Sequence, residues 1–169
     1  MDTRHTLSVR VENKPGVLTR VTALFARRGF NIHSLAVGPT SDPEISRITL
    51  VVDAARTPLE QVTKQLNKLV NVIKVVELEP DTTVQRELLL VKVTATDANR
   101  GSVLQVADMF RGHVVDVVPG AVTIEATGSA QKIEALLASL APYGIKEIVQ
   151  SGAVAITRGA RALADRARK

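Results

Sequence analysis

The start of the chain passes from one hydrophobic period to another. Leu7, Val9 and Val11 are separated by polar residues, a period of two that predicts a half-buried strand. After the Pro-Gly break at 13–16, apolar residues recur every three or four positions as far as Gly29, which predicts a helix that ends at a glycine cap. A strand, a loop and a helix are therefore expected in that order.

Three more strands and a second helix complete the first half. Strands are predicted over 31–37, 48–52 and 72–78, where aliphatic residues alternate with others. The segment Thr57-Pro58-Leu59-Glu60 has the form of a capping box with proline at the first helical position, so the second helix is expected to begin there. The resulting order, β-α-β-β-α-β, is that of the ferredoxin-like unit.

The same order of patterns begins again after a short linker near 80–85. Strands are predicted over 88–93, 113–118, 122–127 and 145–149, and helices over 103–110 and 133–140. The sequence therefore predicts an α+β fold of two consecutive ferredoxin-like βαββαβ domains, at 1–80 and at 84–169, the second ending in a basic helical tail. Small domains with an open sheet face or edge commonly cover it by association, so a homodimer is expected.

Composition limits the classes of function. Apolar residues make up 45% of the chain and aromatic residues only 2%, so the core is expected to be aliphatic. With so few aromatic residues, a base-stacking surface for nucleic acid is not expected. The absence of cysteine excludes disulfides, thiolate metal sites and cysteine nucleophiles. With no targeting segment and no apolar run of membrane-spanning length in the sequence, the expected compartment is the cytoplasm.

The net charge of +5 is concentrated at the C-terminal end. Residues 157–169 carry five basic residues and one acid, which leaves a charge of +1 for the rest of the chain. A basic tail of this kind is more typical of a solvated or partner-docking end than of a DNA reader. Neither a nucleic acid nor a membrane is expected as a partner.

Motifs for catalysis or metal binding are missing from the sequence. The three histidines, His5, His33 and His113, are far apart, and none has metal-ligand spacing to a second histidine or a cysteine. No nucleophile elbow, phosphate-binding loop or dinucleotide motif occurs. We therefore expect no catalytic residues and no metal site, and a binding function rather than catalysis.

The loop between the first strand and the first helix has the features of a ligand site. The main-chain amides of Gly16, Val17 and Leu18 fall at a helix N-terminus, where unpaired N–H groups and the helix dipole favour a carboxylate. Gly16 lets a ligand approach the main chain closely, and Asn13 offers both an acceptor and a donor. The alternative interpretation is an ordinary Pro-Gly turn that opens a helix.

Two short motifs resemble the ACT domain, a βαββαβ module that binds amino acids at subunit interfaces. They are an Asn-x-Pro-Gly-Val-Leu loop at 13–18 and a Gly-x-Asn-Ile step at 29–32. Longer segments in both halves are similar to the acetolactate synthase small-subunit family: 25–32, 34–40, 45–49, 64–69, 72–75, 86–93, 110–112, 115–117, 151–152 and 158–159. The resemblance covers essentially the whole chain.

This resemblance implies a non-catalytic regulatory subunit of branched-chain amino acid biosynthesis. Such a subunit activates the catalytic (large) subunit of acetolactate synthase and confers feedback inhibition, typically by valine. The chain itself would hold no cofactor, and thiamine diphosphate, magnesium and FAD are expected in the catalytic partner. The effector would be held by Asn13, Gly16, Val17 and Leu18 of one subunit together with Asn31 and Ile32 of its neighbour.

Two positions depart from the family pattern. Arg10 stands where an apolar residue is usual, and His33 stands where an acidic or small residue is common, although its side chain is expected to be exposed.

The alternative functions are an amino-acid-responsive regulator of another enzyme or of transcription, and a stand-alone enzyme. Valine, leucine and isoleucine differ by about one methylene, so all three remain candidate effectors.

Overall fold

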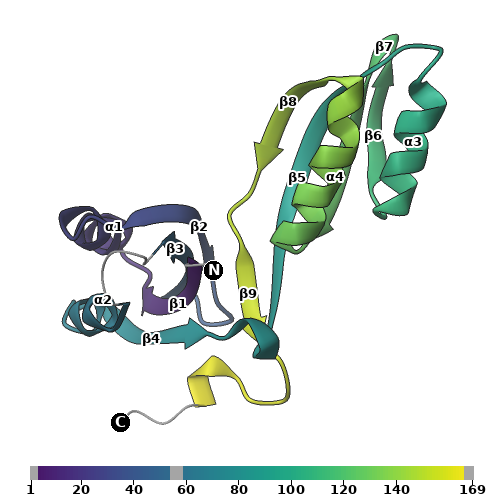
Figure 1. Cartoon of the computed structure of the whole chain (residues 1–169). Coiled ribbons are helices and arrows are strands. Elements are labelled where there is room, and N and C mark those ends of the chain that lie inside the picture. The colour runs from purple at the N-terminus through teal and green to yellow at the C-terminus, as the bar shows by residue number, and fades with distance from the viewer. Residues whose placement is uncertain (1–3, 54–58, 166–169) are drawn as a thin grey trace. The chain divides into compact units, whose positions relative to one another are not determined.

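The computed structural model describes residues 4–53 and 59–165, which form two compact units (Figure 1). Thr57 and Pro58 of the predicted capping box, and the part of the basic tail beyond residue 165, lie outside the described residues. Each unit has strands and helices in the order β-α-β-β-α-β, so the predicted α+β fold of two ferredoxin-like domains is confirmed.

The first unit is an antiparallel sheet with the strand order β2-β3-β1-β4, which places β2 and β4 at its edges. Its elements are β1 (Arg4–Glu12), α1 (Val17–Arg27), β2 (Asn31–Pro39), β3 (Ile45–Asp53), α2 (Leu59–Leu66) and β4 (Val72–Leu78). Both helices lie on one face of this sheet (Figure 1), and the other face carries no helix.

Alternation along the strands separates the side chains of the two sheet faces. Leu7 of β1 and Leu50 of β3 are fully buried in the cluster that the helices share with the sheet. From α1 this cluster receives Val17, Val21 and Phe25, which are four residues apart and therefore lie on one side of the helix. The predicted period of two in β1 and helical period in α1 thus meet in one aliphatic core.

A Schellman motif ends α1 and sets the start of β2. The N–H of Phe30 donates to the carbonyl of Phe25 at 3.0 Å, and the N–H of Gly29 donates to that of Ala26 at 3.2 Å. Gly29 has a φ of 71°, which confirms the predicted glycine cap. The rings of Phe25 and Phe30 pack edge to face with centroids 6.0 Å apart. Asn31 follows at once as the first residue of β2.

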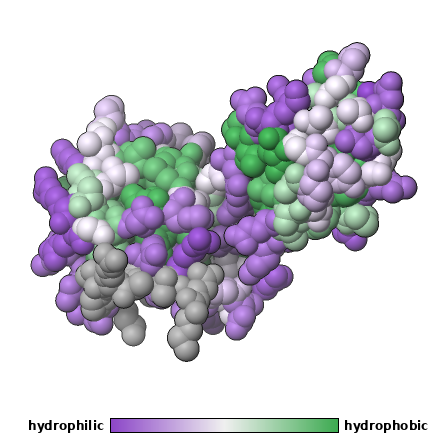
Figure 2. Space-filling view, turned by 45° about the horizontal axis from the view of Figure 1, so that its top comes forward, coloured by the Kyte–Doolittle hydropathy of each residue, from purple (hydrophilic) through white to green (hydrophobic). Residues whose placement is uncertain are grey.

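The second unit has the strand order β6-β7-β5-β8. Its elements are β5 (Thr83–Ala95), whose first two residues belong to the first unit, α3 (Arg100–Met109), β6 (His113–Val118), β7 (Gly120–Gly128), α4 (Ala130–Leu140) and β8 (Ile145–Gln150), with a short 3-10 turn at Ala141–Tyr143. Another 3-10 turn, at Pro80–Thr82, precedes β5 in the first unit. Its core is aliphatic, as the composition predicts. Apolar side chains are also exposed on this unit, notably Val115 and Val117 of β6 and Val149 of β8 (Figure 2).

The end of the chain belongs to a different unit from the one that the sequence predicts. A domain over 84–169 is expected, whereas the second unit covers Gln85–Ser151 and the described residues 152–165 join the first unit. The physical reason is a set of hydrogen bonds that residues of 152–165 make with the first sheet. The described part of the tail is a short strand, β9 (Val154–Thr157), and a 3-10 turn at Leu163–Asp165, where a helical tail is expected.

Candidate functional site

The predicted binding loop is a type II turn that opens α1. Pro15 and Gly16 occupy its two central positions, and the N–H of Val17 donates to the carbonyl of Lys14 at 3.4 Å. Gly16 has φ 83° and ψ −8°, the left-handed conformation that this turn requires at its second central residue. A side chain at Gly16 would meet no other atom within 4 Å, so glycine is needed there for its backbone and not for space.

Asn13 joins this turn to the loop between β2 and β3. Its N–H donates to the carbonyl of Glu44 at 2.8 Å, and its side-chain Nδ2 donates to the carbonyl of Pro43 at 2.9 Å. Because Nδ2 is bound, Oδ1 is the atom of the Asn13 amide that remains to accept a proton donor from outside the loop. The Asn13 side chain itself is exposed.

The mouth of α1 is suited to a small anion. Within the described residues, the N–H groups of Leu18 and Thr19 have no main-chain acceptor, as expected for the first turn of a helix. No acidic residue stands in that turn, so the helix dipole is not opposed there. Leu18 has 39% of its side chain exposed, whereas Val17 is a core residue with 4% exposed. The side chain of Val17 is therefore withheld from this mouth, and its N–H, expected to be unpaired, already donates to the carbonyl of Lys14.

A charged cluster borders the loop. Lys14 Nζ lies 2.8 Å from Glu12 Oε2, and Asn71 Nδ2 donates to the same oxygen at 2.9 Å. The hydrogen bond from Lys14, and after it the one from Asn71, lowers the pKa of the Glu12 carboxyl below its ordinary value. The same hydrogen bond raises the pKa of Lys14, so both charges persist over a wide range of pH.

Asn31 and Ile32 lie at the far end of the first unit. Glu12, next to Asn13, pairs with Ile45 at one end of β3, while Asn31 pairs with Asp53 at the other. Those two ends are about 26 Å apart at the rise of an extended strand, much more than the length of one amino acid. Asn31 is exposed, and Ile32 is half-buried against the first core. One chain thus brings Asn13, Gly16, Val17 and Leu18 together but not the other two residues.

Thr40 organises the loop that holds Asn13, and sequence reasoning missed this part of the site. Its Oγ1 donates to the carbonyl of Ile45 at 2.9 Å and accepts from the N–H of Asp42 at 3.2 Å. These bonds form the turn that presents the carbonyls of Pro43 and Glu44 to Asn13. The turn-forming composition of 38–43 was the only signal available, and it predicts a loop without showing its contact to Asn13.

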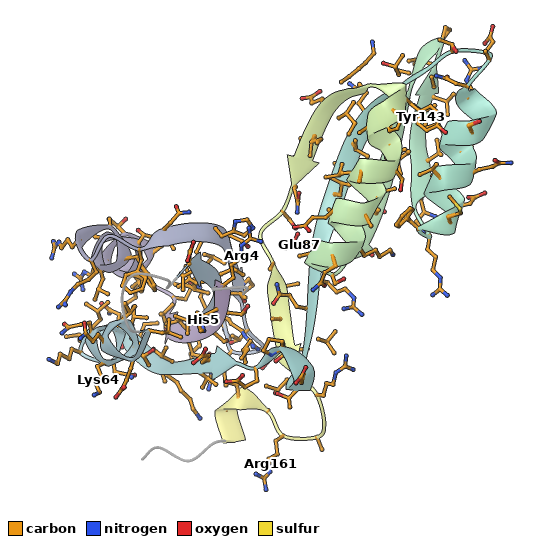
Figure 3. All side chains as sticks on the ribbon, viewed as in Figure 1. Arg4, His5, Lys64, Glu87, Tyr143 and Arg161 are labelled. Carbon is orange, nitrogen blue, oxygen red and sulfur yellow. The ribbon has the colours of Figure 1, made fainter. Side chains whose placement is uncertain are left out.

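The histidines and Arg10 play no part in this loop. His5 of β1 (Figure 3) has its Nδ1 2.7 Å from a carboxylate oxygen of Glu77 in β4. His33 is exposed, as predicted. Arg10 lies on the helix-free sheet face opposite Arg47 of β3. Over the described residues no group of three metal-ligating side chains occurs, and none of the helices there is long and apolar enough to cross a membrane.

A shallow hollow of 380 Å³ lies between the two helices of the first unit. Arg20 and Leu24 of α1 line it together with Arg28, Gln65 and Leu69. It contains none of the six residues proposed to hold an effector. At the mouth of α1, Asn13, Gly16 and Leu18 are exposed in the single chain.

A βαββαβ unit with this loop and this step into β2 is an ACT domain, and the chain is accordingly an ACT-domain protein. Residues 7–74 match the family model of the AHAS small subunit-like ACT domain, and residues 86–159 match the family model of the small subunit of acetolactate synthase. The chain belongs to the acetolactate synthase small-subunit family. The resemblance inferred from its motifs is confirmed.

Relatives from distant organisms match nearly the whole chain. The acetolactate synthase small subunit of Mycolicibacterium smegmatis is 58% identical over 159 residues, 94% of each chain. The probable acetolactate synthase small subunit of Methanothermobacter thermautotrophicus is 49% identical over 160 residues, 94% of this chain and 95% of that one. The crystal structure of the small subunit from Thermotoga maritima has a TM-score of 0.85 at 39% identity and covers 94% of this chain and 99% of its own.

Proposed function

We propose that the chain is the regulatory subunit of an acetolactate synthase. It activates the catalytic large subunit, and it inhibits that subunit when a branched-chain amino acid accumulates, with valine as the foremost candidate effector. The observation that carries this proposal is the mouth of α1, where free amides meet no acidic residue and Asn13 is held in place by Pro43. The ACT-type family model over residues 7–74 supports it. The chain would act in the cytoplasm, beside the large subunit.

The loop would bind the charged end of the amino acid. The N–H groups of Leu18 and Thr19 would donate to its carboxylate, with the helix dipole adding attraction. Asn13 Oδ1, left free by the bond from Nδ2 to Pro43, would accept a hydrogen bond from its ammonium group. The exposed part of Leu18 would contact its aliphatic side chain.

A second copy of the chain would complete the site. The loop and the start of β2 are too far apart in one chain to meet on one amino acid. β2 is an edge strand, and the β2 strands of two copies related by a two-fold axis perpendicular to them run in opposite directions. The Asn31 end of β2 in one copy would then approach the Pro39 end in the other, next to the loop that Asn13 holds. Asn31 and Ile32 would thus come from the neighbour.

Feedback would work through thermodynamic linkage. An effector held across two copies favours the arrangement of the pair in which both halves of the site meet, and it has no effect if all arrangements bind it equally. Linkage energies of about 1–3 kcal/mol are usual and are enough for a several-fold to hundredfold response. The chemistry that thiamine diphosphate, magnesium and FAD provide would belong to the large subunit.

Calorimetric titration of the full chain with valine, leucine and isoleucine tests the binding step. The purified chain is then assayed with pyruvate, thiamine diphosphate, magnesium and FAD, alone and with its large subunit. We expect no turnover by the chain alone, a higher rate of the large subunit in its presence, and inhibition of the complex by the amino acid that binds most tightly. Turnover by the chain alone would contradict a regulatory role. Binding with no effect on the large subunit would indicate regulation of another target.

A further inference from the structure

The described residues 152–165, here called the C-terminal arm, lie on the helix-free face of the first sheet. Side chains that point to this face are almost fully buried within the single chain: Ser8 of β1, Thr49 and Val51 of β3, and Leu78 of β4. The arm contributes three side chains with little exposure, Ala153, Ala155 and Leu163. The arm thus forms a third layer on a sheet that would otherwise have one bare face.

Hydrogen bonds tie the arm to both edges and the centre of this sheet. On the edge strand β2, Ser34 Oγ accepts from the N–H of Ala153 at 2.6 Å. In the centre, Arg47 Nη2 donates to the carbonyl of Ala155 at 2.8 Å. On the opposite edge strand β4, Lys74 Nζ donates to the carbonyl of Leu163 at 2.9 Å.

Arg47 anchors the arm at the cost of a half-buried charge. Its Nε donates to Ser8 Oγ at 2.7 Å, so the guanidinium bridges β1 and the arm. Burial, and after it the charge of Arg10, lowers the pKa of Arg47. A charge in such a place is tolerated only where its donors are satisfied, and the carbonyl of Ala155 is one of the acceptors that satisfy them.

The approach of the arm to β2 leaves no space for a side chain. A methyl group built on Gly152 would overlap the carbonyl group of Leu35 and lie 3.0 Å from the N of Ala36. Both atoms are backbone and cannot move aside without moving the strand. Only glycine allows the arm to contact β2 in this way.

Neighbouring residues of the chain are held by different units. Ser151, the last residue of the second unit, donates its N–H to the carbonyl of Leu88, and its Oγ accepts from the N–H of Leu88, both at 2.9 Å. Gly152 contacts β2 and Ala153 bonds to it. Only the Ser151–Gly152 peptide bond separates a residue that is bonded within the second unit from one that contacts β2.

We propose that the C-terminal arm transmits the effector signal from β2 of the ACT domain to the second unit, with Ser34 and Arg47 as the residues that position it. The inference rests on the proposed function, because Ser34 lies on the same strand as Asn31 and Ile32, the residues proposed to meet the effector. The backbone and side-chain contacts between the arm and β2 couple the position of the arm to the position of that strand. Loss of those contacts separates effector binding from the response.

Amide hydrogen exchange of the full chain, with and without saturating valine, tests this path. In the wild type we expect valine to slow exchange in peptides that cover 13–18 and also in peptides that cover 152–158. In Gly152→Ala and in Ser34→Ala the first protection should persist and the second should be lost. Gly101→Ala is the matched control, because its added methyl group meets no atom within 4 Å, and it should behave as wild type.

The reconstituted complex with the large subunit gives the second readout. Gly152→Ala and Ser34→Ala should raise the valine concentration for half-inhibition about tenfold or more, within the usual range of linkage, while the calorimetric affinity of the free chain changes far less. Ser34→Ala adds no atom, so it tests the path even where Gly152→Ala unfolds the first unit. Two results overturn this inference alone: in the wild type, valine slows exchange at 13–18 but not at 152–158, or both variants are inhibited by valine as the wild type is. No protection at 13–18 overturns the proposed function, and this inference with it.

Discussion

The side-chain Nδ2 of Asn13 donates a hydrogen bond of 2.9 Å to the main-chain carbonyl of Pro43, thirty residues further along the chain. This bond joins the turn that opens α1 to the loop at the end of β2. It also engages the nitrogen of the Asn13 amide, which leaves Oδ1 as the acceptor of this side chain. The candidate site therefore depends on a contact between two loops, in addition to the helix that one of them opens.

Asn13→Ala should weaken valine binding much more than it weakens the fold. The variant loses an acceptor for a charged ammonium group, worth about 1.5–3 kcal/mol, or roughly a tenfold to hundredfold rise in Kd. The free energy of unfolding should fall by only about 0.5–1.5 kcal/mol, for one exposed hydrogen bond. Calorimetry and urea denaturation measure the two effects. Asn67→Ala, at an exposed asparagine beyond α2, is the control and should change neither. An unchanged Kd in Asn13→Ala would remove this residue from the site.

Gly16→Ala should destabilise the first unit through its backbone. Alanine at a φ of 83° costs about 1–2 kcal/mol, and no clash adds to this, because nothing lies within 4 Å of the new methyl group. Thermal denaturation should show a Tm lower by several degrees. Gly38→Ala has equal space and an ordinary φ, so its Tm should stay close to that of the wild type. A Tm of Gly16→Ala equal to that of the wild type would mean that the turn does not need its left-handed residue.

Arg47→Met should destabilise the first unit because it leaves buried polar groups unpaired. Ser8 is fully buried and loses the donor at 2.7 Å, and the carbonyl of Ala155 loses the donor at 2.8 Å. The expected cost is about 1–3 kcal/mol in the free energy of unfolding. The double variant Ser8→Ala with Arg47→Met should recover part of this loss, since it removes one of the orphaned groups. Additive losses in the double variant would show that the two side chains do not interact.

Acid should weaken the loop through Glu12. Its carboxyl has a lowered pKa in the folded chain, so it stabilises the fold above its unfolded value of about 4.5, and that contribution is lost as the pH falls through the folded pKa. Glu12→Gln should therefore be less stable than wild type at pH 7, and the difference should shrink steadily below pH 4.5. Urea denaturation from pH 7 to pH 3 measures it, and high salt should reduce it. A difference that does not depend on pH would mean that the interaction is not ionic.

Most of the two sheets could be predicted from the sequence because their buried residues follow a clear period. Leu7 and Val9 in β1, and Val17, Val21 and Phe25 in α1, show the two spacings without interruption. The glycine cap at the end of α1 was predictable for the same local reason. Contacts between loops could not be predicted in this way. Asn13 bonds to main-chain carbonyls, and any residue at position 43 or 44 provides such a carbonyl.

The C-terminal arm could not be placed from its pattern of hydrophobic residues. In β9 the larger residues Val154 and Ile156 are 56% and 59% exposed, whereas the small residue Ala155, and Ala153 just before the strand, are buried. A strand normally buries its larger apolar side chains, so the alternation here predicts that Val154 and Ile156 are buried and that the alanines are exposed, the opposite of what is found. The close approach of Gly152 to β2 is decided by tertiary packing, for which a single glycine gives no sequence signal.

A mixing experiment tests the central claim, that one valine is held by the loop of one copy and the start of β2 of another. Asn13→Ala and Asn31→Ala are purified separately, mixed in equal amounts, allowed to exchange subunits, and titrated calorimetrically with valine. Each variant alone should bind valine only with a Kd raised about tenfold or more. After exchange, about half of the pairs should be mixed, and each mixed pair contains one intact site and one doubly altered site, so about a quarter of all sites should regain wild-type affinity. No recovery after verified exchange, or full binding by Asn31→Ala alone, would contradict a site shared between two copies.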